Sequence, residues 1–204
     1  MIRKLLALAG LAAVLEACAG PPPPTYSADA FKGIYNQSST SVPANAPATA
    51  TPPVGIIFSE NVEAYLGYIK NTGEYWDSVV PASLKNHAAY ADADPTYFAG
   101  QVLSMLKTRF PSATVIHDFN EAVSAGKKSV VLIDIHSKSM EPYGDRTTKI
   151  DVDAYFFNTR MDPVSRLSGH GEYHVPFASM DAGVQKSIDQ ALAELNGKIS
   201  ALVH

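Results

Sequence analysis

The chain has a single cysteine, Cys18, among 204 residues, so it cannot form an internal disulfide. Its folded part must therefore be held together by an apolar core. Positive charge is also scarce, because 16 Lys and Arg residues stand against 20 Asp and Glu residues, a formal net charge of −4. Nucleic-acid binding requires clustered positive charge, and so does electrostatic binding to anionic lipid. The composition argues against both.

Motifs of common enzyme classes are missing as well. The sequence has no serine in the context of a nucleophile elbow and no glycine-rich phosphate loop. Its only thiol, Cys18, follows an apolar run close to the start of the chain. We therefore expect no enzymatic activity and no cofactor.

Long apolar runs are confined to the beginning of the sequence. After residue 17, no run approaches the roughly 20 residues that a helix needs to cross a bilayer. Residues 1–17 begin with the basic pair Arg3 and Lys4, which the apolar residues 5–15 follow. This pattern predicts a secretory signal peptide, so we expect an exported protein.

The residues around Cys18 suggest what happens at the end of that signal. Leu15-Glu16-Ala17-Cys18 resembles the lipobox of bacterial lipoproteins, although Glu16 stands where a small or uncharged residue is usual. The resemblance implies cleavage before Cys18 and acylation of its thiol and its new amino group, which gives a stable anchor. Ala19, rather than aspartate, after the cysteine implies sorting to the outer membrane.

Ordinary signal cleavage is the alternative. Ala17-Cys18-Ala19 fits the A-x-A rule, and cleavage there would release a soluble protein that begins at Gly20. Two observations favour acylation. A lone thiol would otherwise stay unpaired in an oxidising compartment, and the segment that follows has the composition of a tether.

Residues 18–53 are rich in Pro, Ser, Thr and Ala, as in "SSTSVPANAPATATPP". Such a composition buries little apolar surface, which predicts an extended, mostly disordered linker between the lipidated N-terminus and a domain. The apolar patch "FKGIYNQ", residues 31–37, has two interpretations. It packs back on the domain, or it is a short docking peptide for a partner.

Residues 54–204 are predicted to form a single periplasmic domain. The apolar residues 54–58 suit a buried strand, whereas residues 61–92 fit either a strand or a helix over 62–70, with a turn at 71–73. Asp94-Pro95 begins a helix that ends before Pro111. The next elements are a strand over 113–119, a short helix that Asn120 caps, and a central strand, "SVVLIDIHS", over 129–137.

A hairpin and a helix complete the domain. Residues 147–159 alternate between apolar and polar side chains, the turn "RMDPV" follows, and a strand returns over 165–175. Residues 180–203 form an amphipathic helix. The order is strand, an unassigned segment, helix, strand, short helix, three strands, helix. It predicts an α+β fold, a two-layer mixed β-sheet with helices packed mainly on one face.

This order, with the lipobox and the Pro-rich segment, resembles envelope lipoproteins whose domain is like the amino-terminal domain of TolB. "FAGQVLSMLKTRF", "ATVIHDFNEAV", "SVVLIDIH" and "VQKSIDQALAELNGKI" carry the likeness. Members include the activator of a peptidoglycan synthase and the outer-membrane lipoprotein of the Pel exopolysaccharide system. The resemblance implies binding to other proteins or assembly into rings, without catalysis. A likeness to auxiliary lipoproteins of lipid-transport ABC systems is the alternative.

Three sets of side chains are candidates for chemistry. His170, Glu172 and His174 alternate along one strand, so they share a face. Two imidazoles and a carboxylate can bind zinc, but alternate positions are about 7 Å apart, and a solvated sheet face explains the same pattern. Asp134 and His136 also share a face and form either a satisfied contact or half of a site. His117 and Asp118 point to opposite faces.

Two regions are candidates for binding a partner. Residues 136–149 form a polar loop between strands, where recognition is often located. Aromatic side chains crowd the unassigned segment and serve either as core and rim or as an interaction patch. They are Tyr65, Tyr68, Tyr75, Trp76 and Tyr90.

From these observations we expect a non-enzymatic outer-membrane lipoprotein, anchored through Cys18, with its domain facing the periplasm. Its expected partners are envelope proteins of secretion, polysaccharide or peptidoglycan machinery, and self-association is compatible with this. No metal or cofactor is expected. The alternative is an auxiliary or ligand-binding protein of a lipid or solute transport system, which would need a deep apolar pocket.

Overall fold

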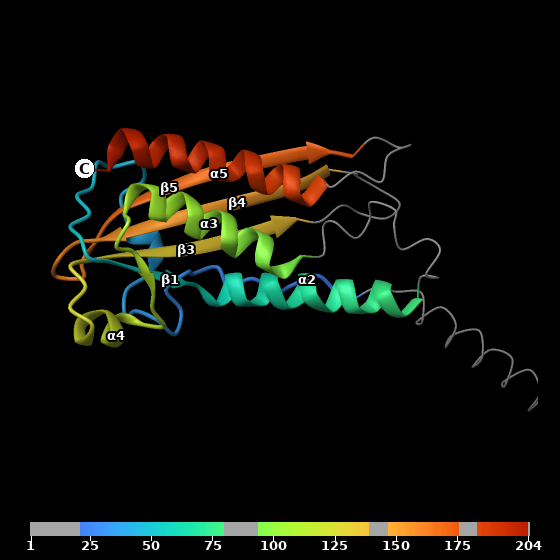
Figure 1. Ribbon diagram of the computed structural model, residues 1–204, viewed down its shortest axis with the longest axis horizontal. Coiled ribbons are helices and arrows are strands. Elements are labelled where there is room, and N and C mark those ends of the chain that lie inside the picture. Colours follow the sequence, from blue (N-terminus) through green and yellow to red (C-terminus); the bar gives the residue numbers. More distant parts are fainter. Residues whose placement is uncertain (1–20, 80–93, 139–146, 176–182, 204) are drawn as a thin grey trace, which may run out of the picture.

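The computed structural model describes residues 21–79, 94–138, 147–175 and 183–203. The alternating and helical patterns of the sequence become strands and helices in the predicted order (Figure 1). The elements are β1 (Val54–Phe58), α2 (Glu60–Val79), α3 (Pro95–Arg109), β2 (Thr114–Val115), α4 (Phe119–Ser124), β3 (Ser129–Lys138), β4 (Thr147–Phe157), β5 (Pro163–His174) and α5 (Gly183–Leu202), with a short 3-10 helix at Ser39–Ser41. The α+β fold is confirmed.

The strands form one mixed sheet in the order β2-β1-β3-β4-β5. β1 runs parallel to β2 and β3, whereas β3, β4 and β5 are antiparallel neighbours. β3 is the middle strand, and its first seven residues are all buried. Its nearly continuous apolar sequence predicted this position, since only a strand that is covered on both faces gains from such a run.

Helices α2, α3 and α5 cover one face of the sheet, which we call the helix face (Figure 1). Alternate residues of the strands point into this layer, including Ile133, Val152 and Leu167, which are fully buried. Gly169 and Gly171 let α5 approach β5 closely. A Cβ on Gly171 would lie 1.8 Å from the carbonyl oxygen of Ser187, so no larger residue fits there without a shift of the helix.

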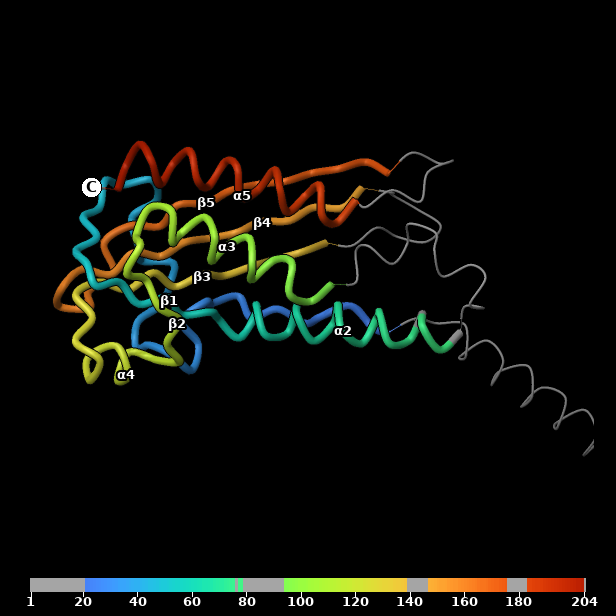
Figure 2. The backbone as a smooth tube through the Cα atoms, viewed as in Figure 1, coloured from blue at the N-terminus to red at the C-terminus, as the bar shows by residue number. Residues whose placement is uncertain are grey.

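The opposite face, which we call the strap face, is covered by the first part of residues 21–53, as far as Val42, and by α4 (Figure 2). We call residues 21–53 the strap. Phe31 is fully buried there against Tyr155 and Phe157, at ring-centroid distances of 5.0 and 5.5 Å. The structure therefore differs from the expected extended linker. The patch at residues 31–37 packs back on the domain, one of its two predicted roles.

Further along, the strap passes around the edge strand β5. The N–H of Arg166 donates to the oxygen of Pro43, and the N–H of Asn45 donates to the oxygen of Arg166. The N–H of Ala48 then donates to Leu202 at the end of α5. Five apolar residues of the strap are buried in the cores of the domain, which composition alone does not reveal; they are Ala30, Phe31, Val42, Ala48 and Ala50.

Several local predictions need correction. Residues 60–79 form one continuous helix, so no turn occurs at residues 71–73. The strand predicted over 113–119 is only two residues long. Asp118, not Asn120, caps α4, because its extended backbone lets its carboxylate accept the N–H of Glu121. The predicted cap of α3 is confirmed, since Asp94 accepts the N–H of Thr96.

The charged and polar side of β4 is also drier than predicted. Asp153 and Tyr155 were expected on a wet face, yet they are only 8% and 3% exposed. Within the ranges given above, no helix is long and apolar enough to cross a membrane.

Candidate functional site

The strap face is divided into an apolar half and a polar half. The apolar half lies under Phe31 and α4, and the polar half occupies the other ends of β3, β4 and β5. Strand register aligns its residues in two rows across the sheet. The rows are Asp134, Asp153 and Ser168, and next to it His136, Asp151 and His170.

Asp134 is the centre of the buried part of the polar half. Asp134 is only 1% exposed, and its carboxylate has three side-chain partners. Ser59 Oγ donates to Oδ1 at 2.5 Å, Asn61 Nδ2 donates to Oδ1 at 2.9 Å, and His136 Nε2 lies 3.0 Å from Oδ2. These bonds supply the hydrogen-bond donors that a buried carboxylate requires.

His136 lies at the rim of this cluster and is about one third exposed, with 37% of its side chain accessible. The hydrogen bond to Asp134 raises the pKa of His136 above its ordinary value. The prediction that the two side chains share a face is confirmed. Of its two interpretations, the structure shows the satisfied contact.

The same cluster binds the beginning of the strap. Asn61, which is 2% exposed, accepts the N–H of Ser27 at 2.7 Å and donates to its carbonyl at 3.1 Å. Tyr26 places its ring edge-on to His136 at 5.4 Å, and its hydroxyl is hydrogen-bonded to Ser137. Burial raises the pKa of Tyr26. One network therefore connects the strap, α2 and β3.

Asp153 lies directly opposite Asp134 on the neighbouring strand. Ser168 donates to its carboxylate, and Arg166 Nε lies 3.3 Å away. Burial raises the pKa of Asp153, because the charged form loses hydration. Arg166 supplies the positive charge nearest to this carboxylate among the residues that the structure describes.

The candidate zinc set does not assemble in the structure. His170 and Glu172 lie side by side on the exposed part of β5, with 3.6 Å between Nε2 and Oε2. His170 also bonds Asp151 at 2.7 Å, which raises the pKa of His170, and Glu172 pairs with Lys149 at 3.1 Å. His174 contacts Thr147 instead. Nowhere in the described ranges do three or more metal-ligating side chains come together.

Other residues that the sequence suggested as functional have structural roles. Asp118 caps α4, and the N–H of His117 donates to Glu121, so these two side chains form no pair. Tyr65 is a core residue, as one interpretation held, and Tyr68 packs partly against the same core. Cys18, Tyr90, most of the loop at 136–149 and the side chain of Trp76 lie outside the described residues.

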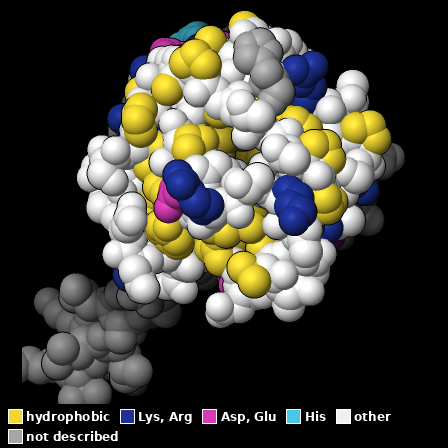
Figure 3. Space-filling view, turned by 90° about the vertical axis from the view of Figure 1, so that its left-hand side faces the viewer, with side chains coloured by type: hydrophobic (Ala, Val, Ile, Leu, Met, Phe, Trp, Pro, Cys, Tyr) yellow, Lys and Arg dark blue, Asp and Glu magenta, His cyan; other side chains and the backbone are white. Residues whose placement is uncertain are grey.

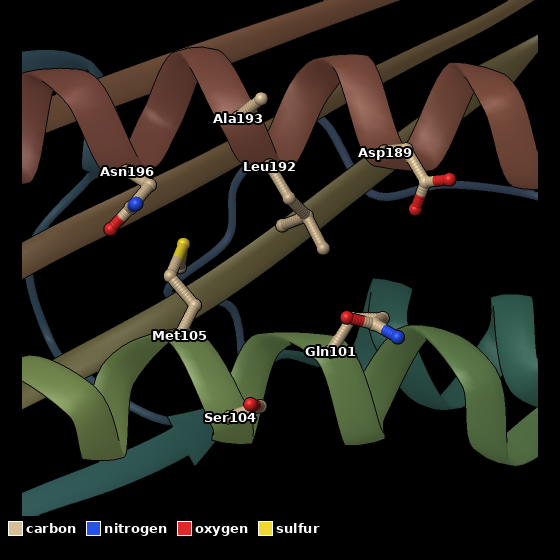
Figure 4. A pocket seen from close by; sticks show the side chains of 7 residues that line it. All are labelled: Gln101, Ser104, Met105, Asp189, Leu192, Ala193 and Asn196. Carbon is tan, nitrogen blue, oxygen red and sulfur yellow. The ribbon is translucent and has the colours of Figure 1, made fainter.

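Sequence analysis missed a shallow groove of about 250 Å³ between α3 and α5. Met105 and Leu192 point toward one another across it, with Gln101 and Asp189 toward one end and Asn196 toward the other (Figure 4). Tyr97 donates to Asp189 at 2.6 Å, which raises the pKa of Tyr97 to about 12. No sequence signal marks these residues, because each is ordinary on an amphipathic helix.

Helix α5 also covers the outer edge of β5. Gln190 and Glu194 accept the N–H groups of Glu172 and His170 at 3.0 and 2.9 Å, and Lys198 donates to the carbonyl of Ser168 at 2.6 Å. These three side chains are spaced four apart, so they line one side of the helix. Together with the strap at Arg166, they bond to backbone groups of Arg166, Ser168, His170 and Glu172 along this edge.

The end of the molecule that carries the β4–β5 turn has a different surface. Lys and Arg side chains lie there among exposed apolar groups, and few acidic side chains are visible (Figure 3). Lys127 and Lys128 precede β3 at this end and form no ion pair within the described ranges, while Arg160 in the turn pairs with Asp162.

Comparison with known proteins gives little further information. No protein-family model and no curated protein matches the chain. Among solved structures, the chain is similar to a dodecamer of a PelC variant from Paraburkholderia phytofirmans, with 10% identity and a TM-score of 0.38 over 79% of this chain and 92% of that chain. A similarity of this degree transfers neither a function nor an oligomeric state.

Proposed function

We propose that the protein is a non-enzymatic lipoprotein of the outer membrane that holds its domain at the membrane surface and binds an envelope protein there. The lipobox-like sequence at Cys18 supports the anchor. The observation that carries the proposal is the docked strap, because its contacts fix Tyr26 and Ser27 to the domain only a few residues after Cys18.

The distance involved is short. Tyr26 is eight residues after Cys18 and already lies on His136. Eight fully extended residues span at most about 29 Å. A lipid on Cys18 would therefore hold the start of the strap within about 3 nm of the headgroups, a much shorter reach than a disordered linker of residues 18–53 would allow.

The contacts in the polar half support a structural role for its ionisable groups. Asp134 binds Ser59, Asn61 and His136, and the His170 side chain binds Asp151. Groups that are engaged in this way stabilise the fold and the strap. We therefore assign the function, binding of a partner, to the surface of the domain and not to a reactive centre.

The alternative, a ligand-binding protein of a transport system, finds less support. It needs a deep apolar pocket between the sheet and the helices, but the described side chains of this layer pack into one core, with Val102, Ile133 and Leu195 all fully buried. The groove between α3 and α5 is small and has a polar rim, which suits neither a lipid tail nor another large apolar ligand.

Membrane fractionation of the full-length protein and of Cys18→Ser tests the anchor. The wild type should sediment with outer membranes and enter detergent, and the variant should be soluble. Crosslinking in intact cells, followed by identification of the attached proteins, tests the partner. A wild type that is already soluble, or one that crosslinks to no envelope protein, would contradict the proposal.

A further inference from the structure

The strap begins at one end of the elongated sheet. Tyr26 contacts His136 and Ser137, which lie near the carboxyl end of β3. The turn that joins β4 to β5 lies at the other end, beyond Ser129, where β3 begins. A strand of this length spans about 30 Å. The two ends of the domain are therefore at very different distances from the point where the strap starts.

The attachment of the strap is specific and has two points. At the first, Asn61 binds both backbone groups of Ser27 through one amide, so a peptide unit is held in a single orientation. At the second, Phe31 is fully buried among aromatic rings of the strap face. Two points only a few residues apart fix the direction of the chain between them as well as its position.

We propose that the strap orients the domain on the lipid surface, with the carboxyl end of β3 toward the headgroups and the β4–β5 turn away from them. This inference rests on the proposed acylation of Cys18. The partner of the first end is the leaflet of phospholipid that contains the acyl chains. The end that carries Lys127, Lys128 and Arg160 is then presented to whatever lies beyond the membrane surface (Figure 3).

Two variants of the full-length, acylated protein, each with one free thiol besides the acylated Cys18, test this orientation. Lys138→Cys places a thiol at the exposed end of β3, and Arg160→Cys places one in the β4–β5 turn, where Arg160 is 82% exposed. Each is labelled with a maleimide fluorophore and incorporated into phosphatidylcholine vesicles that contain a headgroup-labelled quencher lipid. We expect several-fold stronger quenching of the label at position 138 than at position 160.

Variants of the strap show whether docking causes the difference. Tyr26→Ala with Ser27→Pro removes the ring on His136 and the N–H that Asn61 accepts. It should leave the protein in the vesicles but reduce the difference in quenching. Thr25→Ala is the matched control, because Thr25 is exposed and forms no hydrogen bond with the part of the chain that the structure describes, and it should keep the difference. If the double variant does not fold, Tyr26→Ala alone serves.

The outcomes separate the two proposals. If the wild type, which has only Cys18, reacts with maleimide or fails to associate with vesicles, the anchor is absent and both proposals fall. If the protein is anchored but both labels are quenched equally, or the order is reversed, only the orientation is overturned. It is also overturned if the strap variants leave the difference unchanged.

Discussion

The two faces of the sheet are covered by different kinds of structure. The helix face is covered by regular helices that pack a continuous apolar layer, from Val102 in α3 to Leu195 in α5. The strap face is covered by a segment with almost no regular secondary structure, which places Phe31 over one half and leaves polar side chains in the other. The helix face stabilises the fold. The strap face also stabilises it, and in addition it fixes the segment that follows Cys18.

Disturbing the closest contact of the helix face should have the largest effect. In Gly171→Val, the new side chain would meet the carbonyl of Ser187, so α5 must move away from β5. We expect a loss of more than about 4 kcal/mol in the free energy of unfolding, measured by chemical denaturation. Gly197→Ala in α5 is the control, because its Cβ meets nothing within 4 Å, and it should gain about 1 kcal/mol.

The strap face is tested by Phe31→Ala. Phe31 is fully buried, so its truncation should cost about 3–5 kcal/mol, as truncation of Phe98 on the helix face should. Equal losses in the two variants, measured by the same denaturation experiment, would show that the strap is part of the core. A loss below about 0.5 kcal/mol for Phe31→Ala would show that the strap is only loosely attached.

A smaller effect is expected from the polar network. Asp134→Asn keeps the shape but removes the charge and one acceptor oxygen, which leaves a donor of Ser59, Asn61 or His136 without a partner. We expect a loss of about 2 kcal/mol. Proteolysis before Phe31 should also become faster, since Asn61 holds Ser27. Unchanged stability and unchanged cleavage would contradict the role of Asp134 as the centre of this network.

The smallest effect concerns pH. Asp134 raises the folded-state pKa of His136, so protonated His136 stabilises the fold fully below its ordinary pKa of 6.5, and this contribution is lost as the pH rises through the folded-state pKa. The melting temperature should therefore fall from about pH 6 to about pH 9. His136→Gln should flatten this slope.

His170→Gln is the comparison for that experiment. Its hydrogen bond to Asp151 also raises the pKa of His170, but both side chains are at least half exposed, so solvent screens the interaction. It should flatten the slope less than His136→Gln. The opposite ranking would place the pH dependence outside the strap network.

The difference between the two faces also explains which parts of the structure could be predicted from the sequence. The helix face follows from periodicity, since the apolar positions of α5, including Ile188, Leu192, Leu195 and Ile199, can be read directly from their spacing. The strap face depends on contacts between distant residues, such as Asn61 with Ser27 and Asp134, which are 34 and 73 positions away. No local pattern encodes such pairs, and the Pro-rich composition of the strap points to disorder.

The prediction left a strand or a helix open over residues 62–70 and wrongly placed a turn at residues 71–73, and the reason is different. Gly67, Gly73 and the sequence Asn71-Thr72 weaken the helical signal locally. Packing of Tyr65 and Ile69 against the core overrides these weak preferences, so the helix continues. Acylation of Cys18 remains a prediction.

The hydrogen bonds along the outer edge of β5 affect how neighbouring copies of the protein can associate. Proteins tethered to one leaflet meet each other in two dimensions, where an open strand edge would recruit the edge of a neighbour and extend the sheet from molecule to molecule. Pro43 and Asn45 at Arg166, followed by Lys198, Glu194 and Gln190, already bond to backbone groups of Arg166, Ser168, His170 and Glu172 along this edge. Copies of the protein that meet along this strand find these groups taken, which favours contacts through side chains, and such contacts can be selective and reversible.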